Sequence, residues 1–315
     1  MSATTKLLAG VELGGTKCVC ILGTGPDDVR AIERLPTGER EETLRQIESV
    51  LERWRQQYGA PRALGIASFG PTDLKPGSAT WGYITSTPKP GWRDTDVAQR
   101  LGRHCGVPVM FDTDVNGAAF AEGRWGAARG LTDYAYVTVG TGIGGGSIVR
   151  GKSVFGLTHT ELGHIRVARA PGDTFAGICP FHGDCIEGLA SGPAIEARAG
   201  MPASQLPPDH PAWGFVAHGL AQMLHTMVLT TAPARILLGG GVMSAQSHLF
   251  ERIRQELRRS LAGYVEVPEV DAELDKYVVP PGLGTMAGPL GALTLAADAA
   301  TDVSGRKHVF AAVAR

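Results

Sequence analysis

Three glycine-rich segments, each directly after an expected strand, have the composition of phosphate-binding turns. Glycine leaves backbone N–H groups open to an anion because it has no side chain in the way. The first segment, residues 12–17, adds a carboxylate suited to magnesium or water, a hydroxyl that can donate to a phosphate, and an ammonium counter-charge. A double glycine alone is typical of a plain turn with a solvated lysine. Together with the segments at 140–146 and 239–242, it favours a nucleotide site.

The second segment contains a G-x-G-x-x-G match, the pattern of a dinucleotide-binding turn. Such a turn opens a helix, whereas residues 147–152 predict a second strand. We therefore expect a hairpin whose tip of glycine and threonine clamps a phosphate. The third segment, Gly239-Gly240-Gly241-Val242, follows an expected strand at 236–238 and precedes a helix near His248.

The segment Asp112-Thr113-Asp114-Val115-Asn116 joins an expected strand to an expected helix at 117–128. Ligands of α/β sheets bind at such junctions. The residues alone leave two interpretations open. Asp112 or Asp114 is a helix cap, a common use of Asp at helix starts, or Asp114 accepts a proton from a substrate hydroxyl during phosphoryl transfer. The junction by itself slightly favours the cap.

Cysteine and histidine are concentrated in one loop. Cys179, His182 and Cys185 are equally spaced, and His164 lies upstream in the sequence Glu-Leu-Gly-His. Structural zinc takes four nitrogen or sulfur ligands in a tetrahedron. Unrelated buried residues are the alternative, but the surrounding proline and glycine indicate a defined loop and favour zinc. Four protein ligands close the coordination sphere, which predicts a structural ion.

The composition is typical of a two-domain protein. The chain has 315 residues, 43% of them hydrophobic, with 30 basic and 31 acidic residues spread evenly. Without a basic stripe we expect no nucleic-acid partner. The start lacks a secretory pattern, the apolar stretch 223–229 is too short to span a membrane, and five cysteines suggest a reducing compartment. We expect a cytoplasmic protein without a membrane partner.

Short apolar runs and helical periodicity predict the elements that position these segments. Strands are expected at 7–11, 18–22, 29–35, 64–68 and 107–111, with a helix over 44–54 and another near 96–104. A related pattern begins again with strands at 134–139 and 146–149. This order of elements predicts mixed sheets covered by helices. We expect two similar halves that face each other across a cleft. Residues 201–211 predict an exposed loop, and Cys18, Cys20 and Cys105 predict packing residues.

The order of these motifs resembles that of the ROK family of sugar kinases, within it the fructokinase branch. The resemblance runs from Gly10 to about Leu293. It rests on ELGGTK (12–17), YITSTPKPGW (83–92), DTDVNGAA (112–119), TGIGG (141–145), ELGH (161–164), the Cys/His segment with EGLASGP (187–193), and PPGLG (280–284).

The resemblance implies an actin-like ATPase (ribonuclease H-like) fold of two α/β domains with the active site in the cleft between them. The N-terminal domain is expected at 1–117, completed by a helix near 286–315, and the domain with the zinc loop at 118–285. ATP, magnesium and a sugar are the expected ligands, zinc the structural ion, and a homodimer the expected assembly.

The resemblance also implies a role for each site residue. The catalytic base of the family falls on Asp114, so the resemblance favours a general base over a helix cap at this residue. The sugar contacts fall on Gly70, Thr113, Asn116, Glu161, His164 and Glu187. The nucleotide contacts fall on Gly14, Gly15, Thr16, Lys17, Thr141, Gly142, Gly144, Pro193, Gly239, Gly240 and Gly241. The metal ligands are His164, Cys179, His182 and Cys185, so His164 contacts both metal and sugar.

Two departures from the general family pattern point to fructose as the sugar. Glu12 replaces the usual first-turn aspartate, and Thr113 replaces an asparagine that contacts the sugar in glucokinases. The alternatives are a kinase for glucose, mannose or an N-acetylated amino sugar, and a non-catalytic sugar-binding regulator. A repressor of the family carries a helix-turn-helix domain before the first glycine turn, where only about ten residues stand here.

Overall fold

The computed structural model describes residues 6–301, which form two compact units. Unit 1 comprises the described residues of Met1–Trp125, Phe155–His159 and Thr285–Arg315, and unit 2 comprises Gly126–Val154 and Thr160–Gly284. The end of the predicted C-terminal helix, from Asp302 onward, lies outside the described residues. None of the described helices is long and apolar enough to cross a membrane.

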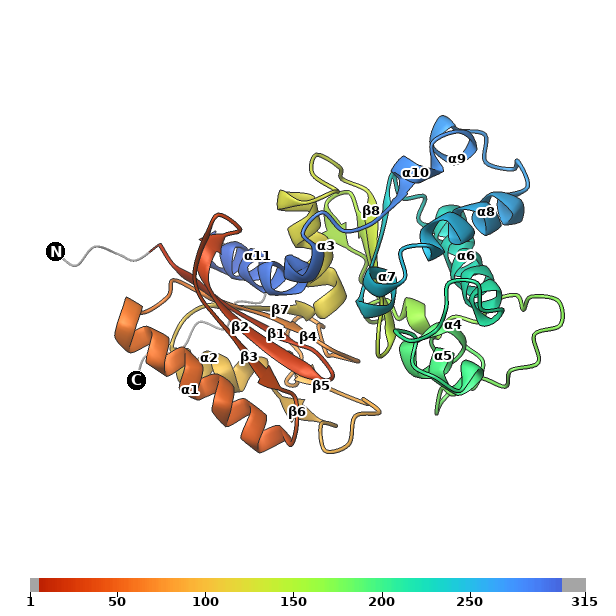
Figure 1. Ribbon diagram of the computed structural model, residues 1–315. Helices are drawn as coiled ribbons and strands as arrows, with labels where there is room; N and C mark the ends of the chain where they lie inside the picture. Colours follow the sequence, from red (N-terminus) through yellow and green to blue (C-terminus); the bar gives the residue numbers. More distant parts are fainter. Residues whose placement is uncertain (1–5, 302–315) are drawn as a thin grey trace. The chain divides into compact units, whose positions relative to one another are not determined.

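Unit 1 is built on a five-stranded sheet (Figure 1). The strands β1 (Leu8–Leu13), β2 (Lys17–Gly25) and β3 (Asp28–Pro36) pair antiparallel, and β4 (Leu64–Ser68) and β7 (Val109–Thr113) run parallel to β1. The order across the sheet is β3-β2-β1-β4-β7. The hairpin and the strands predicted for this part of the sequence are confirmed, although β1 and β2 run further than expected and β7 lies two residues later.

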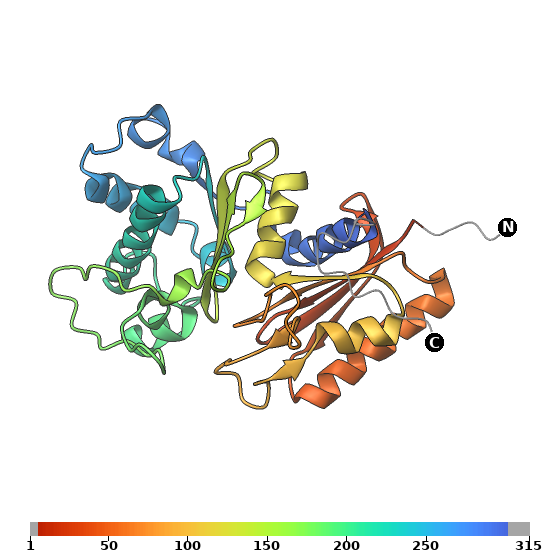
Figure 2. The ribbon, with the colours of Figure 1, turned by 180° about the vertical axis from the view of Figure 1, so that it is seen from behind.

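Helices cover both faces of this sheet, as the view from behind also shows (Figure 2). On one face lie α1 (Arg40–Tyr58) and α2 (Ala98–Cys105), and on the other α3 (Asp114–Trp125) and α11 (Ala287–Thr301). The predicted apolar stripe of α1 is buried against the strands, together with Cys18 and Cys20, which confirms that these two cysteines are packing residues. The short strands β5 (Tyr83–Ile84) and β6 (Thr95–Asp96) pair antiparallel and precede α2 in the sequence.

The helix α11 packs so closely on the sheet and on α3 that two contacts require glycine. A Cβ atom on Gly65 of β4 would lie 1.9 Å from the carbonyl oxygen of Ala292, and one on Gly291 would lie 2.3 Å from the carbonyl carbon of Gly117. The predicted domain boundary at 117/118 therefore falls inside a helix that packs as a whole in unit 1, and the chain passes to unit 2 after Trp125.

We expect Gly65→Ala to destabilise the protein by about 3 kcal/mol or more, because the added methyl group must push α11 away from β4. Urea unfolding followed by circular dichroism measures the effect. Gly38→Ala is the matched control, since a Cβ atom there meets nothing within 4 Å. Equal unfolding midpoints for the two variants would contradict this packing.

Unit 2 repeats the strand order of unit 1. Its sheet runs β10-β9-β8-β11-β12, so in both units the third, second, first, fourth and fifth strands lie side by side. An antiparallel hairpin of β8 (Tyr134–Val139) and β9 (Ile143–Val149) continues into β10 (Lys152–Ser153), and β11 (Ile236–Gly239) and β12 (Val278–Val279) follow in parallel. The expectation of two similar halves is confirmed at the level of topology.

Two long helices cover one face of the second sheet (Figure 1). The helix α6 (Ala212–Thr230) contains the predicted buried stretch and packs with α8 (Leu249–Leu261) against β8 and β11. The smaller helices are η1 (Leu162–His164), α4 (Ile186–Ala190), α5 (Gly192–Ala199), α7 (Gly241–Ala245), α9 (Pro268–Asp271), α10 (Leu274–Tyr277) and η2 (Gly284–Met286), in which the chain passes back to unit 1. Residues 201–211 form the predicted loop.

Candidate active site

The end of β7 and the start of α3 form a hydrogen-bonded junction. The Oγ1 atom of Thr113 accepts from the backbone N–H of Asn116 at 3.2 Å, which is the geometry of a helix N-cap. The Oδ1 atom of Asp112 accepts from the N–H of Thr113 and from Nδ2 of Asn116, both at 2.7 Å. Asp114 bonds the adjacent N–H of Val115 at 2.9 Å. Thr113 caps the helix, so capping does not account for Asp114.

The first glycine turn joins β1 to β2 in unit 1. The N–H of Gly14 donates to the carbonyl oxygen of Lys17 at 3.0 Å, and Gly15, Thr16 and Lys17 are exposed. A residue that the sequence did not single out fixes this turn. The Nζ atom of Lys89 donates to the carbonyl oxygens of Gly15 at 2.7 Å and Thr37 at 3.0 Å. Lys89 lies within the motif at 83–92, but a contact over 74 residues leaves no local pattern.

Glu12 precedes this turn and is the acidic residue of β1. Burial raises its pKa to about 7, against the opposing effect of Lys17 and Arg34. Part of that burial comes from α11, since a Cβ atom on Gly288 would lie 2.0 Å from Oε1 of Glu12. A carboxyl group so placed is half protonated near neutral pH and gains charge when a cation comes close.

The raised pKa predicts a pH dependence of stability. Between about pH 4.5 and 7 the unfolded chain loses the Glu12 proton while the folded chain keeps it, so stability falls as the pH rises through this window and levels off above it. The loss is at most about 3 kcal/mol. Urea unfolding at pH 5 and pH 8, without added magnesium, compares the wild type with Glu12→Gln. The variant should lose less stability between the two values, and parallel profiles would rule out the shift.

The tip of the glycine hairpin in unit 2 contains fewer residues than the sequence suggests. We expected residues 140–146 to form the tip, but β9 begins at Ile143, and Gly144, Gly145 and Gly146 pair with Thr138, Val137 and Tyr136 of β8. The tip is the turn in which the N–H of Gly140 donates to the carbonyl oxygen of Gly142 at 2.9 Å. Glycine is needed within β9 because η1 packs on it: a Cβ atom on Gly145 would lie 2.6 Å from Leu162.

Two further predicted nucleotide segments lie against this tip. The N–H of Gly192 donates to the carbonyl oxygen of Gly140 at 2.7 Å, which places the first turn of α5, with Pro193, beside the hairpin. Gly240 has a φ of 92°, and a Cβ atom there would lie 2.4 Å from the carbonyl oxygen of Val139. Unit 2 therefore brings together the glycine clusters at 140–142 and 239–241, while the turn at 14–15 belongs to unit 1.

The four predicted metal ligands converge in unit 2. One ligand atom from each of His164, Cys179, His182 and Cys185 lies within 4.8 Å of the others. The Nδ1 atom of His164 is 3.8 Å from Sγ of Cys179 and 3.6 Å from Sγ of Cys185, and Nδ1 of His182 is 3.7 Å from Sγ of Cys179. Tetrahedral zinc with ordinary bond lengths separates nitrogen and sulfur ligands by about 3.5 Å. The donor set and its spacing therefore fit zinc.

The local fold explains how the ligands converge. The backbone N–H groups of Cys179 and Gly183 each donate to the other's carbonyl oxygen, at 3.1 and 2.9 Å, which closes a tight knuckle. Cys185 is the N-cap of α4, and His164 is the last residue of η1. The N–H of Ile186 donates to the carbonyl oxygen of Ile165 at 3.0 Å and ties the two short helices together.

The predicted sugar residues of unit 2 lie beside this cluster. The Nε2 atom of His164 is 3.9 Å from Oε1 of Glu187, and Oε2 of Glu187 accepts from the N–H of Ile143 at 3.0 Å. Burial raises the pKa of Glu161, with His164 opposing the effect and Glu187 adding to it. Gly70, Thr113 and Asn116 belong to unit 1, where Gly70 closely follows β4.

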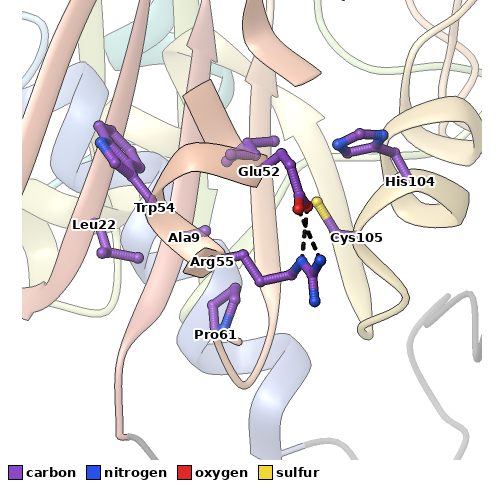
Figure 3. A pocket seen from close by; sticks show the side chains of 9 residues that line it. Ala9, Leu22, Glu52, Trp54, Arg55, Pro61, His104 and Cys105 are labelled. Atoms are coloured by element: carbon purple, nitrogen blue, oxygen red, sulfur yellow. Dashed lines mark hydrogen bonds and ion pairs between the residues drawn. The ribbon is translucent and has the colours of Figure 1, made fainter. Parts of the chain in front are cut away.

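A cavity of unit 1 contains none of these residues (Figure 3). Its wall includes Trp54 and Cys105, and Glu52 accepts two hydrogen bonds from Arg55 at 2.7 Å. Burial and nearby Glu48 raise the pKa of the Cys105 thiol to about 12. The thiol is therefore protonated and unreactive, in agreement with a packing role.

The two units, each a mixed sheet with the same strand order and covering helices, define the actin-like ATPase fold. The sequence model of the ROK family matches residues 8–299, and the chain belongs to this family.

Named relatives cover nearly the whole chain. A putative fructokinase of Bacillus subtilis is 43% identical over 93% of this chain and 96% of its own length. The fructokinase of Zymomonas mobilis is 43% identical over 94% of this chain and 98% of its own length. The crystal structure of a ROK hexokinase from Thermus thermophilus superposes with a TM-score of 0.74 at 28% identity, covering 94% of this chain and 99% of that one.

Proposed function

We propose that this protein is an ATP-dependent fructokinase, which converts D-fructose and ATP to D-fructose 6-phosphate and ADP. The observation that carries the proposal is the junction after β7, where Thr113 caps α3 and Asp114 stands in the first turn, at the position on which the catalytic base of the ROK family falls. The 43% identity to proteins called fructokinase, together with Glu12 and Thr113 at the positions that depart from the general family pattern, supports fructose as the sugar.

In this mechanism Asp114 takes the proton from the primary hydroxyl of the sugar as that oxygen attacks the γ-phosphorus of ATP. The bond to the bridging oxygen breaks and ADP leaves. Backbone N–H groups of the turns at 14–15 and 140–142 bind the phosphates, with Lys17 as counter-charge and Pro193 and Gly239–Gly241 beside the nucleotide. Glu12 is the carboxylate that would hold magnesium brought in with ATP, and the ion would supply positive charge to the phosphates. Positioning and electrostatics supply most of the rate.

The sugar contacts in this proposal come from Glu161, His164 and Glu187. The side chains of Thr113 and Asn116 form hydrogen bonds within the junction and so help to hold Asp114 in place. Gly70, which follows β4 in unit 1, is a further proposed sugar contact. We further propose that zinc bound by His164, Cys179, His182 and Cys185 holds the sugar loop. A homodimer in the cytoplasm is proposed from the family resemblance.

A coupled assay of ADP formation with a panel of hexoses tests the proposal. We expect fructose to give the highest kcat/KM, at least tenfold above glucose, mannose and N-acetylated amino sugars. A clear preference for one of those sugars would replace fructose as the substrate. No turnover on any sugar, with sugar binding retained, would identify a non-catalytic regulator instead.

A further inference from the structure

Glu187 lies between the Cys/His cluster and the glycine hairpin of unit 2. It lies two residues after Cys185, in the first turn of α4. One carboxylate oxygen, Oε2, accepts from the N–H of Ile143 at the base of the hairpin tip, at 3.0 Å. The other, Oε1, lies at ion-pair distance, 3.9 Å, from Nε2 of His164. A single side chain therefore faces both sites at once.

The hairpin is fitted to this carboxylate. A Cβ atom on Gly142 would lie 2.7 Å from Oε2 of Glu187, so a larger residue at the tip would displace the carboxylate. A Cβ atom on Gly163 would lie 1.7 Å from the carbonyl oxygen of Ile143, so η1 also packs directly on β9. The Oγ1 atom of Thr160 donates to the carbonyl oxygen of Gly145 at 3.3 Å. The loop that carries the cluster thus holds the hairpin by its backbone.

The two ring nitrogens of His164 face different groups, one toward the cysteine sulfur atoms and the other toward Glu187. Its Nδ1 atom faces the sulfur atoms of Cys179 and Cys185 at 3.8 and 3.6 Å. With Nδ1 bound to a metal, the neutral ring carries its proton on Nε2, the ring atom that lies 3.9 Å from Oε1 of Glu187. At this distance the contact is electrostatic and longer than a hydrogen bond. A metal-binding histidine commonly donates its second N–H to a carboxylate, which fixes both groups.

We infer that Glu187 is a positioning residue that couples the metal cluster to the phosphate-binding hairpin, so that metal bound at His164 strengthens nucleotide binding. The inference rests on the proposed nucleotide site at this hairpin. It adds that the metal acts on the nucleotide as well as on the sugar loop, through one carboxylate that is hydrogen-bonded to Ile143 and lies in electrostatic contact with His164.

The sign of the effect separates this link from simple electrostatics. Glu187 carries negative charge beside a site for anionic phosphates, so neutralising it should strengthen nucleotide binding by Coulomb's law. Coupling predicts the opposite for Glu187→Gln. The amide has one oxygen and one NH2 group, so either the N–H of Ile143 or Nε2–H of His164 faces NH2 where the carboxylate presented an oxygen, and the link is broken at one end.

The experiment is a titration of a non-hydrolysable ATP analogue with magnesium, without sugar, on wild type, Glu187→Gln and Asp184→Asn. Asp184 is the charge-matched control, since it lies in the same loop and pairs with Arg166 and Arg169. With metal bound, we expect Kd to rise about fivefold in Glu187→Gln and to stay within twofold of wild type in Asp184→Asn. Unchanged or tighter binding by Glu187→Gln would overturn the inference.

Removal of the metal completes a thermodynamic cycle. A chelator should raise Kd of the wild type about fivefold and that of Glu187→Gln less than twofold, because the variant has already lost the link. Equal weakening of both proteins would assign the effect to the metal without Glu187 and overturn the inference. Amide hydrogen exchange supplies a second readout on the metal-loaded proteins: we expect faster exchange at Ile143 in Glu187→Gln but not in Asp184→Asn. The analogue titration needs no sugar, so a failed fructose assay leaves this test intact.

Discussion

Replacing Asp114 by Asn is expected to lower kcat about 10³-fold while the protein stays folded. General base catalysis typically contributes 10² to 10⁴ in rate, and an amide of the same shape accepts no proton at neutral pH. The fold should tolerate the change, because the Oδ1 atom of Asn can still accept from the N–H of Val115 as Asp114 does. Steady-state kinetics with fructose and ATP measure the loss.

The neighbouring threonine provides a contrasting variant. Thr113→Ala removes the N-cap of α3 and should cost about 1 kcal/mol of stability, whereas Asp114→Asn should leave the unfolding midpoint and metal content unchanged. KM for fructose should also change little in Asp114→Asn, since the side chain acts on the proton and not on sugar binding. Retention of more than a tenth of wild-type kcat would assign the base elsewhere.

The sequence predicted β4 and β8 to the residue because both are short, mainly apolar runs without a charged residue. It placed the end of β7 two residues early and the start of α3 three residues late. The strand continues through Asp112 and Thr113, and Thr113 then caps the helix. The polar letters of this junction fit a turn, a cap or a site equally well. Only the hydrogen bonds distinguish which residue performs which task.

The site shows the same limit of local patterns. Residue types alone were enough to predict the Cys/His cluster, because two cysteines and two histidines within 22 residues are typical of a metal site. They did not reveal that Gly144 and Gly145 lie in a strand, since glycine has no strand preference and the reason is the packing of Leu162 on Gly145. The anchoring of Gly15 by Lys89 and of Ile143 by Glu187 joins distant segments, and these contacts exist only once both segments have folded.

Removing the metal is the second change from which we expect a large effect. Zinc held by four side chains binds only the folded loop, so its binding free energy adds to the stability of unit 2. Chelation should lower the melting temperature by about 10 °C, if bound zinc contributes about 4 kcal/mol to a unit of this size. Turnover of fructose should fall as well, because His164 and Glu187 are placed by the same loop.

Cysteine variants show whether the cluster itself is responsible. Atomic spectroscopy measures bound zinc, which we expect at one ion per chain in the wild type. Cys185→Ser should reduce this content and should reproduce the chelator's effect on melting. Cys105→Ser is the matched control, because that thiol lies in unit 1 against α1 and outside the cluster. Zinc added back should restore the chelated wild type but not Cys185→Ser. A wild type that melts at the same temperature with and without chelator, or a Cys185→Ser protein with full zinc content, would contradict a stabilising zinc ion at this cluster. The convergence of sulfur and Nδ1 atoms at 3.6 to 3.8 Å would then need another cause, such as packing of protonated thiols against neutral imidazoles.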